Sequence, residues 1–242
     1  MTTLAIASVA VLAGAVVRGF TGFGASMFWV ASLSLLYAPA SVVPTVLALE
    51  VLASLVLLPT VHREVHWRSI RWLFLGTVLT MPFGVYLLSV VPDRPMRVGV
   101  ALVILAATIA VASGVQLAHR AGTGAAVTAG SVSGVFNGAT GIGGPPAVLF
   151  YLSGSSSHEV GRASLVAYFL GIDAIGFAMM AGVGLVDTAV LVHTAVLAPL
   201  ALGGIALGQA AFGRSGGAGY RGVVIGVLLM LSVAMLVRAA AG

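Results

Sequence analysis

The sequence predicts an all-α integral membrane protein made of two homologous helical repeats, and two observations carry this prediction. Of the 242 residues, 60% are hydrophobic and only 7% are charged, which is too little polar surface for a water-soluble chain of this length. A six-residue pattern, G-x-T-G-x-G, occurs once in each half of the chain. We therefore expect one membrane domain whose first repeat covers residues 1–120 and whose second covers residues 121–242.

Long apolar stretches predict the crossing helices. Stretches of about 20 residues recur along the chain, and a helix of this length crosses about 30 Å of hydrocarbon. The clearest lie at residues 72–91, 98–118, 188–212 and 223–237. The first apolar stretch, residues 4–17, has no basic residue before it and a poor cleavage site after it, so we expect retained structure and not a signal peptide.

The duplicated motif defines the register between the repeats. Its copies are residues 19–24 and residues 138–143, and the same register pairs Arg18 with Asn137. Further matches are Ser26 with Pro145, and weaker ones are Gly84 with Gly204 and Arg97 with Arg221. Each half is therefore expected to repeat the same series of elements.

Each copy of the motif separates two short apolar pieces. These are residues 4–17 and 27–37 in the first half, and residues 125–136 and 147–152 in the second. Neither flank of a motif is long enough to cross comfortably, so each pair is either one broken span or a re-entrant hairpin. Three crossing helices complete each half.

Arginine placement favours the hairpins, because cytoplasmic loops are enriched in basic residues. With the arginine-rich loop at residues 63–71 inside, hairpins leave only Arg94, Arg97 and Arg238 outside, whereas crossing spans divide the arginines evenly. Three crossings and a hairpin per half would invert one half relative to the other, as in many secondary transporters. The acidic loop at Asp187, which corresponds to the arginine-rich loop, agrees with this inversion.

Composition argues against several other classes. The formal net charge is +5, but the arginines that supply it sit singly or in short groups between apolar segments, which is not the basic stripe of a nucleic-acid-binding protein. The sequence contains no cysteine, which excludes disulfides, cysteine-ligated metals and thiol catalysis. It contains no G-x-x-x-x-G-K motif, so transport driven by ATP on this chain is not expected. No cofactor or metal site is predicted.

The glycine motifs predict an anion site. Glycine permits the non-helical backbone of a helix break, and the free N–H groups at the start of the next helix attract water or an anion. Proline at 145 suits the first turn of such a helix. The alternative is that these glycines serve close helix packing. The predicted substrate-binding residues are Arg18, Gly19, Thr21, Gly22, Gly24, Ser26, Asn137, Gly138, Thr140, Gly141, Gly143, Gly144 and Pro145.

Four ionisable residues lie at or beside the apparent membrane depth, where charge is costly and usually functional. Arg18 is either the counter-charge of the anion or an arginine that reaches the interface. Glu50, Asp173 and His193 are candidates for proton coupling, and the alternative is a structural hydrogen bond or an ion pair such as Arg18 with Glu50. The motif register pairs Glu50 with Phe169, one helical turn before Asp173, so we expect the two carboxylates on related faces of equivalent helices.

At the repeated motif the sequence resembles the sulfite exporter family called TauE/SafE, whose members are duplicated membrane proteins with a glycine-rich motif in each half. The matching residues are Gly19, Thr21, Gly22, Gly24, Gly138, Thr140, Gly141, Gly143, Gly144 and Pro145. The resemblance covers essentially the whole chain and implies transport of sulfite, sulfoacetate or another organosulfonate. Residues 25–27, Ala-Ser-Met, depart from the Gly-Pro-Pro of the second copy, which leaves the particular anion open.

The predicted function is that of a secondary transporter in the bacterial cytoplasmic (inner) membrane, which moves a small anion by alternating access. A passive anion channel is the nearest alternative, and it differs in whether flux follows a proton gradient. A less favoured alternative is an intramembrane serine protease, in which His193 would activate Ser26. The expected partners are the small anion and the lipid bilayer, and a homodimer is left open.

Overall fold

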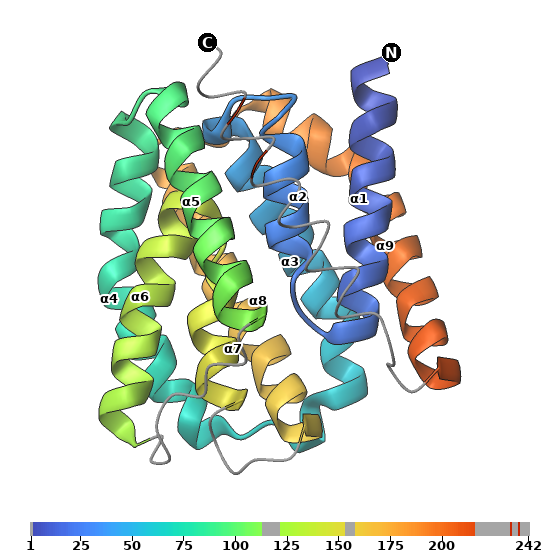
Figure 1. The fold of residues 1–242 in the computed structure, drawn as a ribbon, viewed down its shortest axis with the longest axis vertical. Helices are drawn as coiled ribbons and strands as arrows, with labels where there is room; N and C mark the ends of the chain where they lie inside the picture. Colours follow the sequence, from blue (N-terminus) through green and yellow to red (C-terminus); the bar gives the residue numbers. More distant parts are fainter. Residues whose placement is uncertain (1, 113–121, 153–157, 216–232, 234–236, 238–242) are drawn as a thin grey trace.

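The computed structural model describes residues 2–112, 122–152 and 158–215, together with Val233 and Val237. Every regular element in these ranges is a helix, as Figure 1 shows. Five of the helices are long and apolar enough to cross a membrane. Large apolar side chains such as Leu79 and Val9 are about 70% exposed, which suits a surface in contact with lipid. The chain is therefore an all-helical, multi-pass membrane protein.

The helices follow the same order in each half. The first half contains α1 (Thr2–Thr21), α2 (Ala25–Leu33), α3 (Pro39–Val61), the short 3-10 turn η1 (His62–Glu64), α4 (Trp67–Val90) and α5 (Asp93–Ala112). The second contains α6 (Thr123–Thr140), α7 (Gly144–Leu152), α8 (His158–Gly182) and α9 (Thr188–Ser215). The predicted spans at residues 98–118 and 223–237 extend outside the described residues, as does the predicted repeat boundary at residue 120.

The helix breaks are narrower than predicted. α1 continues through Gly19, so the first break contains only residues 22–24, and the second contains residues 141–143. Gly22 and Gly24 have φ angles of 81° and 91°, and Gly141 has a φ angle of 69°, which side-chain-bearing residues rarely adopt. The expectation that neither flank could cross was wrong for α1, whose 20 residues are long enough.

Each break turns the chain back on itself. In Figure 1, α2 returns alongside α1, and the indole N–H of Trp29 on α2 donates to the carbonyl of Val11 on α1 at 2.9 Å. α2 and α7 have nine residues each, which is about 13 Å of helix and too short to cross hydrocarbon. α3 and α8 lie against each other between these hairpins and carry much of the buried core.

Helices of opposite halves pack closely against each other: α4 lies along α6, and α1 lies along α9. Glycines at these contacts allow the backbones to touch. A Cβ on Gly84 would collide with the backbone of Val135, and a Cβ on Gly208 would collide with the backbone of Val16. Since Val16 and Val135 are equivalent in the motif register, Gly84 corresponds to Gly208. The predicted match of Gly84 with Gly204 was therefore wrong, because the second half has extra residues between its motif and α9.

We expect Gly84→Ala and Gly208→Ala each to destabilise the protein by about 1–3 kcal/mol, because the added methyl group must push two backbones apart. The control is Gly99→Ala on α5, where a Cβ would meet nothing within 4 Å. The measurement is the melting temperature in detergent. Equal melting temperatures for all three variants would show that these close approaches do not stabilise the fold.

Candidate functional site

Arg18 is buried at the end of α1 and forms an ion pair with Glu50 on α3. The Arg18 side chain is 1% exposed, and its Nη1 lies 2.7 Å from Glu50 Oε2. Its Nη2 donates to Ser54 Oγ at 2.6 Å, and its guanidinium carbon lies 5.3 Å from the centre of the Phe169 ring. Arg18 therefore does not reach the interface, and the buried ion pair that the sequence left as an alternative is present.

Asn137, the register partner of Arg18, binds the second carboxylate. Its Nδ2 donates to Asp173 Oδ1 at 3.0 Å, and its Oδ1 accepts the backbone N–H of Gly143 at 3.1 Å. Asn137 and Asp173 are both buried. Since Arg18 binds Glu50 and Asn137 binds Asp173, the two carboxylates hold equivalent places. The predicted match of Glu50 with Phe169 was wrong, because the second half has extra residues after its motif that shift the register, as they do for Gly84 and Gly208.

The two pairs form one central cluster, which we define as Arg18, Glu50, Asn137 and Asp173. Asp173 lies close enough to Glu50 and Arg18 for both of their charges to act on it. With all groups ionised the cluster has one positive and two negative charges. An unbalanced charge in an apolar interior is costly. The cluster is therefore expected to bind a proton on one of its carboxylates.

Glu50 also occupies the position in which the sequence predicted a bound anion. α2 begins at Ala25 after Gly24, which offers no side-chain cap. The backbone N–H of Ser26 in the first turn lies near the carboxylate of Glu50, although neither carboxylate oxygen accepts a hydrogen bond from the described residues. The positive end of α2 thus faces a negative side chain of the protein itself.

The predicted glycines divide into two groups. Gly19 and Gly138 lie inside helices at the contacts with α9 and α4, where a Cβ would meet the partner backbone. Gly22, Gly24 and Gly141 form the two turns through their positive φ angles. Helix packing and turn geometry therefore account for these five positions, and their direct contact with a substrate remains a prediction.

Three of the remaining predicted residues, Thr140, Gly144 and Pro145, lie beside the second break. The Thr140 hydroxyl donates to the Phe136 carbonyl at 2.7 Å and accepts the N–H of Ile142 at 3.3 Å, so it stabilises the turn. Gly144 and Pro145 form the first turn of α7, as predicted for a helix start. The side chain of Thr21 lies outside the described part of the structure, so its role in substrate binding stays a prediction.

His193 lies away from the central cluster. It stacks against Tyr37, with ring centroids 4.9 Å apart, beside a cavity with room for about one water molecule. This cavity also touches Leu33, which is seven residues beyond Ser26 on α2 and hence about 10 Å along the helix. The arrangement does not support a role for His193 as the base that activates Ser26.

A buried hydroxyl network beside Asp173 was missed. The Tyr168 hydroxyl bonds to Thr77 and donates to Ser133 Oγ at 2.8 Å, and Ser133 donates to the carbonyl of Gly143 at 2.6 Å. A spacing of residues that recurs in both halves could have revealed this network, and also the match of Glu50 with Asp173. Hydroxyl residues precede the carboxylate by nine and five positions in both halves, namely Ser41, Thr45 and Glu50, and Ser164, Tyr168 and Asp173.

A bundle of apolar helices with charged groups buried between two helix breaks defines a membrane transport protein. Residues 6–235 match the family model described as "Sulfite exporter TauE/SafE", and the chain belongs to this family. It is a multi-pass protein of the bacterial inner membrane, as the sequence predicted.

A curated relative agrees with this family. The chain is 27% identical over 234 residues to the "Probable sulfite/organosulfonate exporter TauE" of Cupriavidus necator. The matched region covers 94% of the chain and 91% of the relative. No solved structure matches the chain.

We expect Arg18→Gln to destabilise the protein by about 3–5 kcal/mol, because it leaves Glu50 buried without a counter-ion. The double variant Arg18→Gln, Glu50→Gln should recover most of this loss, since it removes both charges together. Thermal unfolding in detergent measures both. If the losses measured for Arg18→Gln alone and for Glu50→Gln alone simply add in the double variant, the pair is not an interacting unit.

Proposed function

We propose that the protein is a secondary transporter that moves sulfite or an organosulfonate by alternating access, coupled to protons. The observation that carries this proposal is a buried guanidinium at the centre of the bundle, held by a carboxylate beside the start of a broken helix. The printed name of the Cupriavidus relative supports sulfite or an organosulfonate as the cargo, and export as the direction. Association into a homodimer stays a prediction.

The arrangement of the helices supports inverted repeats. Gly204 on α9 lies against Leu12 on α1 and Gly208 lies against Val16, so the two helices run in parallel, and α4 and α6 do the same. In Figure 1, α1 runs downward from the labelled N terminus, whereas α6 runs upward. Two halves related in this way can exchange conformations, which opens a central site first to one side and then to the other.

The central cluster supports binding of an oxyanion. A guanidinium presents several N–H donors in one plane, and this geometry matches the oxygens of a sulfite or sulfonate group as it matches those of a carboxylate. Arg18 is bound by Glu50 in this conformation, so an anion reaches it only after a rearrangement, which supports a carrier over an open channel. Glu50 and Asp173 are the groups placed to carry a proton, whereas His193 lies outside the cluster.

We expect the protein in liposomes to show saturable uptake of radiolabelled sulfite that responds to a pH gradient. Arg18→Ala should lower this uptake by tenfold or more, on the order of the loss of one charge-assisted contact, and Thr140→Val should lower it less. Arg68→Ala is the matched control, because Arg68 is exposed at the start of α4.

Two outcomes would contradict the proposal. Uptake that rises in proportion to concentration without saturation would indicate a channel. Full uptake in Arg18→Ala, with the variant correctly folded, would remove the central cluster as the binding site.

A further inference from the structure

We infer that Glu50 is an internal anion that occupies the substrate's place on Arg18 and at the start of α2, so that substrate binds only when Glu50 leaves. This inference rests on the proposed function, because it concerns the same site. It assigns Glu50 as the residue that controls access of an external anion to Arg18.

The contacts of Glu50 are those an oxyanion would make. Its carboxylate lies 2.7 Å from Arg18 Nη1 and near the start of α2, and neither of its oxygens accepts a hydrogen bond from the described residues. A sulfite or sulfonate group has the same charge sign as a carboxylate, and two of its three oxygens can accept the N–H groups of a guanidinium as the two carboxylate oxygens do. The two cannot occupy one place together, so they compete.

Arg18 keeps a donor for a further anion. Its Nε is buried and has no hydrogen-bond partner among the described residues. A buried donor without a partner costs stability, on the order of 1–3 kcal/mol, and a ligand with three oxygens can satisfy it. This is a second feature, independent of the helix start, that points to a ligand at this position.

The equivalent carboxylate in the other half has a different environment. Asp173 is bound by the neutral amide of Asn137, and the N–H of Gly143 is taken by that same amide. An external anion gains no positive charge by displacing Asp173. The exchange is therefore confined to the first half, where the only charged donor of the cluster lies.

The groups that face Glu50 define how pH acts on the exchange. Arg18 on α1 attracts the charged carboxylate, whereas Asp173 on α8 repels it. Protonation removes the charge of Glu50 and thereby its hold on Arg18. Binding of an external anion is consequently stronger at low pH than at high pH.

The experiment measures binding of methanesulfonate to the purified full chain in detergent, by the shift in melting temperature at a series of pH values. Methanesulfonate stays ionised throughout, so any pH dependence belongs to the protein. Ionic strength is held constant with sodium gluconate. In the unaltered protein, apparent affinity should rise as pH falls, by at most about tenfold per pH unit.

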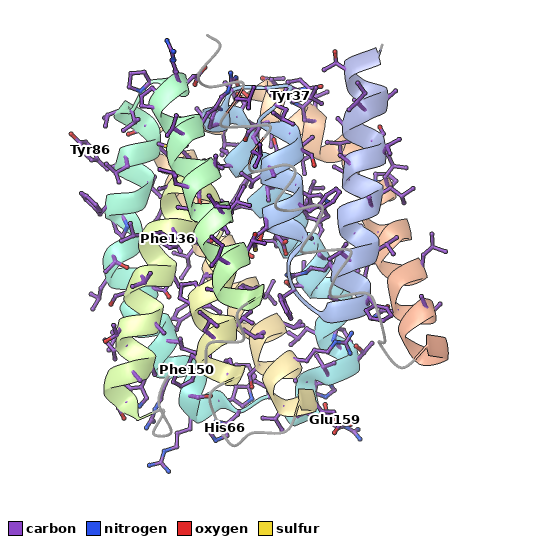
Figure 2. All side chains as sticks on the ribbon, viewed as in Figure 1. Tyr37, His66, Tyr86, Phe136, Phe150 and Glu159 are labelled. Carbon is purple, nitrogen blue, oxygen red and sulfur yellow. The ribbon has the colours of Figure 1, made fainter. Side chains whose placement is uncertain are left out.

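Two substitutions separate charge from packing. Glu50→Gln removes the competing charge, so it should bind methanesulfonate at least tenfold more tightly at high pH and with a weaker pH dependence, because Asp173 alone remains in the cluster to take up a proton. Glu50→Asp keeps the charge on a shorter side chain and should retain the pH dependence. Glu159→Gln, an exposed site at the start of α8 that Figure 2 labels, is the control and should behave as the unaltered protein.

The outcomes distinguish this inference from the proposed function. If Glu50→Gln gains neither affinity nor stability from methanesulfonate, the internal-anion role is overturned, even where the unaltered protein transports sulfite. If Glu50→Gln gains both but neither protein transports any anion in liposomes, the role of Glu50 stands and the transporter proposal fails. Should Glu50→Gln not fold without ligand, recovery of its folded yield on purification in methanesulfonate supports the inference, and no recovery overturns it.

Discussion

A guanidinium group in the apolar centre of a membrane protein needs a counter-ion, and Glu50 supplies it to Arg18. This one contact fixes the relation of three elements. α1 must end where Arg18 reaches the centre, α3 must present Glu50 at mid-length, and α2 must begin beside that carboxylate. The break at Gly22 to Gly24 satisfies the last condition, because its positive φ angles turn the chain shortly after Arg18, so that α2 begins close to the ion pair.

Close helix contacts make this centre possible. Gly19 and Gly138 follow Arg18 and Asn137 directly in the sequence, and each lies against the backbone of a helix from the other half. Arg18 therefore sits beside the close contact of α1 with α9, and Asn137 sits beside the close contact of α6 with α4. In this way the same motif provides a packing surface through its first glycine and a turn through its later ones, so the two interpretations of the motif describe different positions within it.

The sequence predicted membrane residence, the helix breaks and the family, because composition and a strict glycine motif depend on local chemistry alone. It placed the two carboxylates on related faces of equivalent helices but could not pair Glu50 with Asp173, since the register read from the motif fails once the second half carries additional residues before Ser164. The ion pair of Arg18 and Glu50 was open among several alternatives, because its formation depends on how α1 and α3 pack, which no local pattern specifies. The hydroxyls five residues before each carboxylate were the signal that would have restored the register.

The difference between Arg18 and Asn137 bears on proton coupling in the proposed mechanism. With every group ionised, the empty cluster carries one more negative than positive charge, and one bound proton makes it neutral. A monovalent anion on Arg18 adds a further negative charge, so a neutral loaded cluster needs both Glu50 and Asp173 protonated. If the interior tolerates only neutral clusters, the state loaded with a monovalent anion holds one more proton than the empty state. A second arginine at position 137 would leave this difference at one proton, but the empty cluster would then be neutral without any proton. Asn137 in place of an arginine therefore means that the cluster keeps a proton even when it holds no anion.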